Sequence, residues 1–419
     1  MNERIKVNVT SEIGDLEAVL VHTPGIEVES MTPETAQRAL YSDILNLSVA
    51  LDEYVQMRGV LEKLTNTFEV RDLLSDVLNL DHVRTSLIDK VCLKEGLEDI
   101  KETLHDLQYN ELARVFIEGL PMKKNNLTRY LDVNRFTLDP LPNFFFTRDA
   151  ASAIHGNVLV NKMANKVRER EADIMEAIFT NHPNIDAATI NPDRSSKPVL
   201  ERRMEGGDIL VARKDVLIIG LSTRTSSQGI DYILKKVACN SNIKHIIVQE
   251  LPKSPESFIH LDMIFTFIDV NKCMVYKPVV ESSRYLTIHI EVDNCKVVSI
   301  SEGKNLSQLL KSLGFDLQFL SCGGNKHILN QEREQWHSGA NFFALAPGKI
   351  IGYERNVYTI EELSNNGFEV IKAKDFISGK VDLDLYKKWV ITIHGAELAR
   401  GGGGCRCMTM PFKRKDVDF

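Results

Sequence analysis

The sequence predicts an α/β protein in which short strands and helices alternate, interrupted by one long helical stretch. Two observations predict this class. No proline occurs between Pro33 and Pro121, where Leu, Val, Asp, Glu and Lys dominate, so this stretch is expected to be mostly helical. Elsewhere, short β-rich runs alternate with turns and helical patterns. The 419 residues, 43% of them hydrophobic and 26% charged, are typical of a folded chain of two or three domains.

Within the proline-free stretch, apolar residues recur at helical spacing. These stripes are expected to pack helix against helix, and their residues are interpreted as core. They comprise Leu73-Leu74 with Val77-Leu78, and Leu97, Ile100, Leu104 and Leu107.

The remaining chain is expected to form hairpins, helices and further strands. Apolar runs flank tight turns at 213–215 and 269–272, which indicates two hairpins. After the first, a helical pattern over Ser227–Ala238 leads to the strand Ile246–Val248, and the same order recurs over 360–371. The repeat is irregular in spacing and indicates a cyclic array of α/β units. The expected strands and hairpins are Leu16–Val21, Val158–Val160, Ile209–Ile219, Met263–Val275 and Phe342–Tyr353.

Charge and hydropathy exclude several classes of function. With 58 acidic and 51 basic residues the net charge is −7, without a basic stripe, so no nucleic-acid partner is expected. The longest apolar runs, such as Val216–Leu221, are far shorter than the roughly 18 residues that span a membrane. Met1–Gly14 lacks the apolar core of a secretory signal. The protein is expected to be cytoplasmic, with no membrane partner.

The seven cysteines are odd in number and scattered, unlike a disulfide framework. Most are expected to be reduced and buried. Only Cys405 and Cys407 lie close together in sequence, and no second cysteine pair could complete a tetrahedral zinc site with them. No structural metal is therefore expected.

Two acidic motifs are candidates for binding. The aromatic segment Asn143–Phe146 is expected to be a strand that leads into Arg148 and Asp149, and a strand end suits a binding carboxylate. A core strand that meets a solvated turn is the alternative. In Glu205-Gly206-Gly207-Asp208, two glycines let the backbone pass close to a neighbour while two acids suit a cationic substrate or proton transfer. A plain glycine turn before a strand is the alternative there.

His260 and Asp262 form a third candidate. If the segment is extended, both side chains lie on one face, because strand side chains alternate. They would then be a proton-transfer pair. A structural histidine is the commoner case, and the same spacing occurs in metal sites.

The strongest local feature is a run of four glycines, 401–404, that precedes Cys405 and Cys407. It is expected to be a mobile loop that ends at a nucleophile, since thiolates are nucleophilic and a neighbouring cation such as Arg406 favours that form. A flexible tail is the alternative, although the segment continues into an apolar run stopped by Pro411.

Together these motifs supply a thiol, an imidazole and four carboxylates. A guanidinium is planar and presents its donors in a fixed fork, so two carboxylates can grip it while a thiolate approaches its carbon. Covalent hydrolysis of a guanidinium is the predicted chemistry. The four carboxylates belong to Asp149, Glu205, Asp208 and Asp262.

The order of these motifs resembles that of the arginine deiminase family over most of the chain. The resemblance implies an α/β fold of the guanidine-modifying (pentein) superfamily, a five-bladed pseudo-symmetric α/β propeller with an inserted all-helical domain. The catalytic domain would comprise residues 1–70 and 141–419, and the helical insertion residues 71–140. The matching motifs include FTRD at 146–149, EGGD at 205–208, His260-Leu261-Asp262, Arg333–Trp336, Asn341 and Cys407–Pro411.

The resemblance also implies the catalytic roles. Cys407 would attack the guanidinium carbon and release ammonia, leaving an amidino group on its sulfur. His260 would protonate the ammonia and then activate water, and Glu205 would orient the imidazole. L-arginine would become L-citrulline without a cofactor or metal, in a protein that is expected to be a homo-oligomer.

Substrate-binding roles follow from the same resemblance. Asp149 and Asp262, with Asp208 as support, would hold the guanidinium, and Phe146 would line the pocket. A pair of arginines would bind the substrate α-carboxylate, which agmatine lacks and which a peptidyl arginine has tied up in an amide. These arginines are Arg168 and Arg224.

Other functions remain open at this point. Agmatine deiminase, dimethylarginine hydrolase and amidinotransferase would use the same thiol, imidazole and acids. A non-catalytic guanidine-binding protein is a different class, against which the nucleophile counts. A zinc hydrolase with His260 and Asp262 as ligands is the last alternative.

Overall fold

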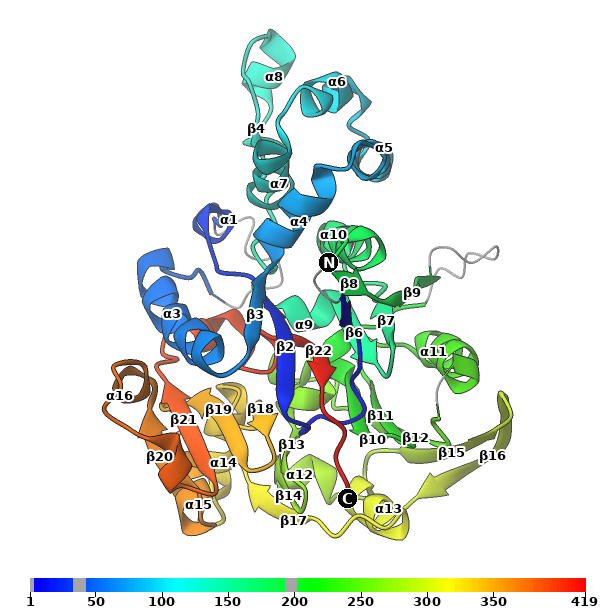
Figure 1. Cartoon of the computed structure of the whole chain (residues 1–419), viewed down its shortest axis with the longest axis vertical. Helices are drawn as coiled ribbons and strands as arrows, with labels where there is room; N and C mark the ends of the chain where they lie inside the picture. The colour runs from blue at the N-terminus through cyan, green and yellow to red at the C-terminus, as the bar shows by residue number, and fades with distance from the viewer. Residues whose placement is uncertain (1–3, 33–42, 193–201, 241) are drawn as a thin grey trace.

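The computed structural model describes residues 4–32, 43–192, 202–240 and 242–419. Short sheets and their connecting helices form the larger part of the molecule, and a group of helices projects from it at one end (Figure 1). This is the mixed α/β class that the sequence predicts.

Five of the sheets share one arrangement. In each, a central strand has an antiparallel neighbour on one side and a parallel neighbour on the other. Named with the central strand second, they are β6 (Ala151–Ile154), β7 (Asn157–Val160), β9 (Ala188–Ile190); β10 (Ile209–Arg213), β11 (Val216–Leu221), β12 (His245–Glu250); β13 (Phe265–Asp269), β14 (Lys272–Val275), β17 (Gln318–Ser321); β18 (Phe343–Ala346), β19 (Lys349–Tyr353), β21 (Trp389–Ile393); and β22 (Met410–Arg414), β2 (Leu16–Val21), β3 (Asn66–Glu69).

The other strands extend these sheets or form small ones. β15 (Thr287–Asp293) and β16 (Lys296–Gly303) extend the second sheet, and β20 (Glu369–Lys372) extends the fourth. Two separate two-stranded sheets pair β1 (Ile5–Lys6) with β8 (Ile185–Asp186), and β4 (Leu120–Pro121) with β5 (Phe136–Leu138).

A helix lies between each central strand and its parallel neighbour in the chain, because parallel strands need a crossover connection. The expected unit of hairpin, helix and strand is therefore present. The crossover helices are α3 (Leu47–Leu64), α10 (Glu169–Asn181), α11 (Ser227–Asn240), α13 (Leu306–Ser312) and α15 (Val357–Asn365). The other α-helices described in this part are α1 (Ile26–Glu29), α9 (Thr147–Ala150), α12 (Lys277–Val280), α14 (Ile328–Trp336) and α16 (Ala373–Ile377).

The projecting group contains most of the proline-free stretch. The apolar residues of the predicted stripe from Leu73 to Leu78 are buried. The second stripe is divided between short helices after Gly96, which ends its helix with a φ of 72°. Because β4 and β5 also lie here, residues 71–140 are not all helical as expected. The helices of this group are α4 (Val70–Leu78), α5 (Asp81–Glu95), α6 (Lys101–His105), α7 (Tyr109–Glu118) and α8 (Leu127–Leu131).

Two local predictions are wrong. Asn143–Phe146 form turns instead of a strand, and Asp149 lies on the short helix α9 (Thr147–Ala150). His260 is extended but Leu261–Met263 form a 3-10 turn, so His260 and Asp262 do not share a strand face. In both places burial of the segment against the rest of the fold overrides the local strand pattern.

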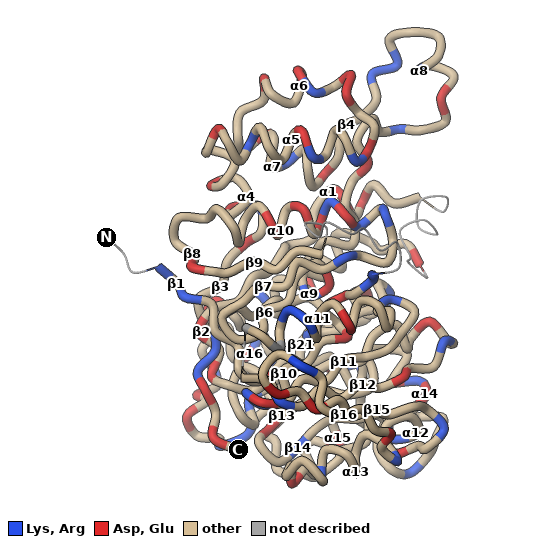
Figure 2. The backbone as a smooth tube through the Cα atoms, turned by 90° about the vertical axis from the view of Figure 1, so that its right-hand side faces the viewer, with Lys and Arg blue, Asp and Glu red and all other residues tan. Residues whose placement is uncertain are grey.

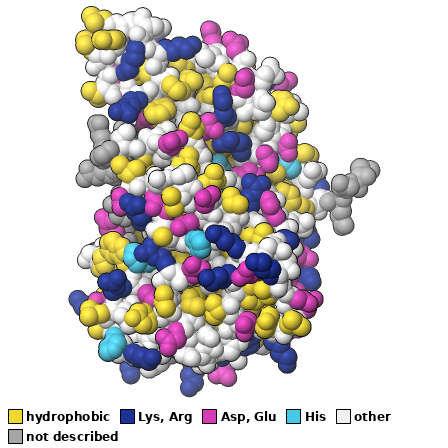
Figure 3. Space-filling view, turned by 90° about the vertical axis from the view of Figure 1, so that its left-hand side faces the viewer, with side chains coloured by type: hydrophobic (Ala, Val, Ile, Leu, Met, Phe, Trp, Pro, Cys, Tyr) yellow, Lys and Arg dark blue, Asp and Glu magenta, His cyan; other side chains and the backbone are white. Residues whose placement is uncertain are grey.

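The distribution of charge on the surface and the state of the cysteines agree with the expectations from the composition. Lys and Arg are interspersed with Asp and Glu along the backbone, and on the face shown in Figure 3 both signs lie among scattered apolar side chains (Figures 2 and 3). All seven cysteines are free thiols, and only Cys239 and Cys295 are exposed. None of the helices described is long and apolar enough to cross a membrane.

Candidate active site

Each of the five repeated sheets has a short segment that carries a polar side chain of the site. Each segment leads into the strand that pairs antiparallel with the central strand of its sheet, so the five segments occupy equivalent places in the repeated units. Segments that are far apart in the sequence therefore contribute to one place. The residues are Asp149 before β6, Glu205 and Asp208 before β10, His260 and Asp262 before β13, Asn341 before β18 and Cys407 before β22.

A pocket lies between these turns, and six of the nine predicted site residues line it. The other three, Glu205, Asp208 and Asp262, lie immediately behind the lining and are fully buried. The lining consists of Asn143, Phe146, Asp149, Arg168, Arg224, Ile259, His260, Gly401, Gly402, Gly403 and Cys407.

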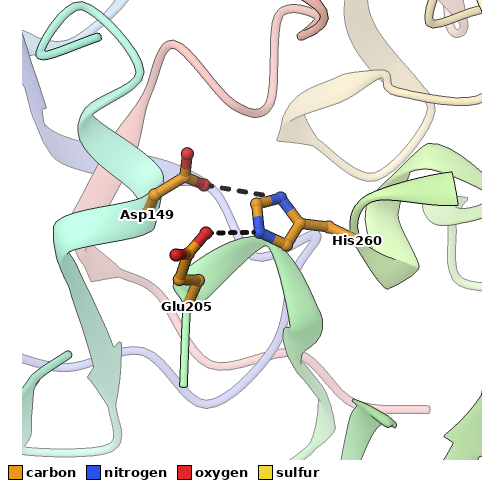
Figure 4. Close-up of side chains that lie close together, drawn as sticks. All are labelled: Asp149, Glu205 and His260. Atoms are coloured by element: carbon orange, nitrogen blue, oxygen red, sulfur yellow. Dashed lines mark hydrogen bonds and ion pairs between the residues drawn. The ribbon is translucent and has the colours of Figure 1, made fainter. Parts of the chain in front are cut away.

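The buried imidazole of His260 lies between two carboxylates. Its Nε2 is 2.9 Å from Glu205 Oε2, and its Nδ1 is 3.7 Å from Asp149 Oδ1 (Figure 4). Burial alone lowers the pKa of His260, but the charge of Asp149 and the hydrogen bond with Glu205 outweigh it and raise this pKa to about 9. The imidazole is therefore protonated at neutral pH. Although burial opposes it, the hydrogen bond with His260 lowers the pKa of Glu205.

The glycines of the EGGD motif make this arrangement possible. A Cβ atom at Gly207 would lie 2.4 Å from His260 Nδ1, and one at Gly206 would collide with the carbonyl oxygen of Arg148. The neighbours to which the backbone passes close are thus the imidazole of His260 and the segment that carries Asp149.

One carboxylate oxygen of Asp149 is hydrogen-bonded and the other is not. Its Oδ2 accepts a hydrogen bond of 2.7 Å from Arg168, whose Nε and Nη2 donate to Glu171 at 2.8 to 3.1 Å. All three side chains are buried. The other oxygen of Asp149, Oδ1, has no hydrogen-bond partner in the described part of the chain. A buried carboxylate oxygen without a donor is costly, so Oδ1 is free to receive a donor from a ligand.

The thiol of Cys407 lies next to a second carboxylate. Its Sγ is 3.6 Å from Asp262 Oδ2, which also accepts a 2.8 Å hydrogen bond from Arg406. Arg406 in turn pairs with Glu12. Burial, followed by the charges of Asp262 and Asp149, raises the pKa of Cys407 well above its usual value. The charge of Arg406 lowers this pKa, as expected, but burial and the two carboxylates outweigh it and keep the thiol protonated.

Asn341 fixes the backbone around Cys407. Its side-chain oxygen accepts hydrogen bonds from the amides of Arg406 and Cys407 at 2.9 and 3.2 Å, and its Nδ2 is 3.2 Å from Cys407 Sγ. A Cβ at Gly404 would lie 2.7 Å from Asn341, and one at Gly403 would lie 2.4 Å from the ring of Phe146. The glycine run therefore permits close packing, and its mobility stays a prediction.

Asp208 supports the pocket indirectly. It accepts hydrogen bonds from the Ser222 hydroxyl at 2.6 Å and from the Leu261 amide at 2.9 Å. The Ser222 oxygen accepts the amide of Arg224 at 2.9 Å. Arg224 lines the pocket, with its Nη1 3.7 Å from Glu205 Oε1.

The arrangement of acids bears on the zinc alternative. The ligand atoms of Asp149, Glu205 and His260 lie within 4.8 Å of one another, whereas Asp262 is paired with Arg406 and is not part of this group. His260 would have to lose the proton that its raised pKa holds before it could bind a metal. His260 and Asp262 therefore do not form the pair of metal ligands that the zinc alternative requires.

A comparison with protein families shows to which family the chain belongs. A family model described as arginine deiminase matches residues 37–414. The chain belongs to the arginine deiminase family. An arginine deiminase of Mycoplasma capricolum is 32% identical over 428 residues, which are 98% of each chain. An arginine deiminase of Bacillus cereus is 32% identical over 98% of this chain and 99% of its own. One of Oenococcus oeni is 31% identical over the full length of both chains, 100% of each.

Solved structures of low sequence identity share the fold with this family member. An amidinotransferase from Microseira wollei superposes with a TM-score of 0.55 at 14% identity and covers 98% of both chains. The DDAH of Pseudomonas aeruginosa has a TM-score of 0.51 at 13% identity and covers 95% of this chain and 99% of its own. At these identities the similarity concerns the pentein fold alone.

Three residues of the site were not predicted in the roles that they have here. The sequence places Asn341 in a motif without assigning it a role, and it predicts no role for Glu12 or Glu171. A local signal existed for Asn341, because it precedes a hairpin just as Asp149 and Asp262 do. Glu171 also had a local signal, since it lies three residues after Arg168. Glu12 had none, because the fold brings it to Arg406 from the other end of the chain.

Proposed function

We propose that this family member is an arginine deiminase that hydrolyses L-arginine to L-citrulline and ammonia. The observation that carries the proposal is the meeting, at one pocket, of the Cys407 thiol, the His260 imidazole and an Asp149 oxygen without a donor. The proposed catalytic residues are Cys407, His260 and Glu205, and membership of the family supports the same reaction.

Asp149 and Asp262 receive the substrate guanidinium. Asp149 offers its free Oδ1, and Asp262, behind the lining, lies 3.6 Å from Cys407 Sγ. A guanidinium that donates to both carboxylates has its carbon next to the sulfur, because its donors are fixed in a plane. Phe146 contributes an apolar wall.

The bound cation activates the thiol. Without it, the negative charges of Asp262 and Asp149 oppose the formation of a thiolate at Cys407. A guanidinium between the two acids neutralises those charges, and lowers the pKa of the thiol. The thiol releases its proton to solvent, and the resulting thiolate forms a bond to the guanidinium carbon, which gives a tetrahedral intermediate.

His260 supplies and then removes the protons of the two half-reactions. Its imidazolium, which Glu205 stabilises, protonates the departing nitrogen; the C–N bond breaks, ammonia leaves and the amidino group stays on Cys407. The neutral imidazole then takes a proton from water, whose oxygen attacks the amidino carbon. Collapse of this second intermediate breaks the C–S bond. Arginine and water have become citrulline and ammonia, and the thiol is restored.

Arg168 and Arg224 are the proposed ligands of the substrate α-carboxylate. Both line the pocket. Arg224 is the better placed, because within the described residues it has a long ion pair of 3.7 Å with Glu205, whereas Arg168 already donates to Asp149 and Glu171. Asp208 acts through Ser222 on the position of Arg224.

The finer organisation of the fold is part of this proposal. The five sheets with one strand order support a closed five-bladed propeller formed by residues 1–70 and 141–419, from which residues 71–140 project as a mostly helical insertion. A cytoplasmic location and a homo-oligomeric state stay predictions.

A product assay tests the function. The purified protein is incubated with L-arginine, agmatine and methylated arginine in separate reactions with EDTA, and ammonia and ureido products are measured. We expect citrulline from arginine and no product from the other two. Activity on another guanidine alone would overturn the substrate, and no product from any of them would favour amidino transfer or a non-catalytic binder.

A further inference from the structure

We propose that Glu53, on the crossover helix α3, is a positioning residue that sets the path of the chain leading to Cys407. The inference rests on the proposed function, since it concerns how the nucleophile is placed. Glu53 is distant in sequence from the segment that it holds, and it touches none of the reacting atoms.

The carboxylate of Glu53 binds three consecutive backbone amides. Its Oε1 accepts from Ala396 at 2.9 Å and from Glu397 at 3.2 Å, and its Oε2 accepts from Glu397 at 3.0 Å and from Leu398 at 2.9 Å. The side chain is 4% exposed. These amides precede the 3-10 turn Leu398–Gly401, whose first N–H groups have no partner within the turn. Buried donors must be satisfied, and here a carboxylate from another part of the chain satisfies them.

Neighbouring residues attach the same segment to the same part of the chain. Gln56, one turn further along α3, accepts the amide of His394 at 3.2 Å. The amide of Asn46 donates to Glu397 at 2.6 Å, and Arg400 bridges Glu397 to Asp43. The chain from residue 394 to residue 400 is thus fixed at four points by residues 43–56.

The fixed segment leads directly into the catalytic loop. Gly401, Gly402 and Gly403 follow it and line the pocket, and the Gly403 carbonyl accepts a hydrogen bond of 3.0 Å from Tyr353. On the far side of the loop, Asn341 holds the amide of Cys407.

The loop is therefore anchored at its start through Glu53 and at its end through Asn341. A short chain between two fixed ends has few positions for its side chains. Displacement of the first anchor moves the glycines that line the pocket, and with them the Sγ of Cys407 relative to Asp262. A misplacement of about 1 Å can cost on the order of a hundredfold in rate.

The experiment compares Glu53→Gln with a matched control on the same helix. Glutamine places an N–H donor opposite two backbone N–H groups and so loses half of the hydrogen bonds. The control is Glu62→Gln, which removes the charge of a side chain that is 51% exposed and pairs only with Arg58. kcat and KM for arginine are measured well below the unfolding temperature. The rate at which iodoacetamide alkylates Cys407 is measured by mass spectrometry of its peptide, because Cys239 and Cys295 are exposed and also react.

We expect Glu53→Gln to lower kcat about 10- to 100-fold with a smaller change in KM, and to change the alkylation rate of Cys407 several-fold. Glu62→Gln should match the wild type in both. A residue that only stabilises the fold would lower the unfolding temperature and leave both readouts unchanged. If Glu53→Gln does not fold, Gln56→Ala, which removes one hydrogen bond to the same segment, should give smaller changes in the same direction.

The outcomes separate this inference from the proposed function. Unchanged kcat and alkylation in folded Glu53→Gln, or in Gln56→Ala where that variant decides, overturn the positioning role and leave the deiminase activity intact. A wild type that does not turn arginine over, combined with altered alkylation of Cys407 in Glu53→Gln, overturns the proposed function and supports the positioning role.

Discussion

Two histidines in the structure, His22 and His260, occupy almost the same chemical environment. Each is fully buried between two carboxylates. His22 lies 3.1 Å from Glu27 and 3.2 Å from Glu69, as His260 lies 2.9 Å from Glu205 and 3.7 Å from Asp149. In both, the carboxylates outweigh burial and raise the pKa to about 9.

The surroundings of the two imidazoles differ. The acids beside His22 are bound by nearby backbone amides, Glu69 by Thr23 and Glu27 by Gly25, and the ring packs against Phe144. The group around His260 instead lines a pocket together with a thiol, and one oxygen of Asp149 has no donor. A perturbed imidazole is therefore not a sufficient sign of function. Access and a neighbouring nucleophile distinguish the active site.

The largest effect should come from the thiol, which only the His260 region has. Cys407→Ser should lower kcat by at least about a thousandfold, since the covalent intermediate cannot form on a weak nucleophile. Cys405→Ser, two positions away and also buried, should keep most of the activity. Steady-state citrulline formation measures both. The reverse result would move the nucleophile to Cys405.

The next effect compares the two histidines directly. His260→Asn should lower kcat about 100- to 10,000-fold, as expected for the loss of a general acid and base. His22→Asn should leave kcat near the wild-type value but lower the free energy of unfolding by about 3 kcal/mol, because Glu27 and Glu69 lose their buried partner. Kinetics and urea denaturation of both variants test this. Equal losses of kcat would remove the distinction between the two regions.

A smaller effect concerns the substrate alone. Arg224→Ala should raise KM for arginine about 10- to 100-fold, because a charged hydrogen bond to the α-carboxylate is lost. Agmatine, which has no carboxylate, is the matched control substrate: any slow turnover or competitive inhibition by agmatine should be almost unchanged. A similar loss for both compounds would show that Arg224 acts through Glu205 instead.

The smallest effect is a dependence of stability on pH that both regions share. A histidine whose pKa is raised in the folded state contributes stability that is complete below its unfolded pKa of about 6.5 and is lost as the pH rises through about 9. The free energy of unfolding should therefore fall between pH 6.5 and pH 9. His22→Asn should remove the part of this fall that His22 contributes, so the variant loses less stability over the same range. Denaturation curves at pH 6, 7.5 and 9 measure it. An identical fall in the variant would exclude His22 as a source.

Patterns that depend on neighbouring residues could be predicted from the sequence. The hairpins around 213–215 and 269–272 and the helix after Ser227 appear where expected, because hydrophobic periodicity and turns are local. The strand expected at Asn143–Phe146 does not form, because three aromatic rings are buried there in a turn. Their β propensity reflects a half-buried surface that this segment does not have.

The candidate site was predictable to the extent that its residues carry motifs. Cys407, His260 and the acids could be named from their order in the chain. The partners that decide their charge could be predicted only in part. Glu171 follows Arg168 at the i,i+3 spacing of a helical pair, which is a local signal. Glu12 pairs with Arg406 only after the fold has brought the two ends of the chain together, and such a salt bridge leaves no spacing in the sequence.

The pairing of β22 with β2 has a consequence for the timing of catalysis in the living cell. β22 directly follows Cys407, and it pairs with a strand from the first part of the chain. A ribosome that has synthesised the chain only as far as β18 has already made Asp149, Glu205 and His260, but not Cys407, the proposed nucleophile. The nascent polypeptide can thus bring the acids and the imidazole together before the thiol exists. On the proposed mechanism, hydrolysis begins only after β22 has been made and has paired with β2.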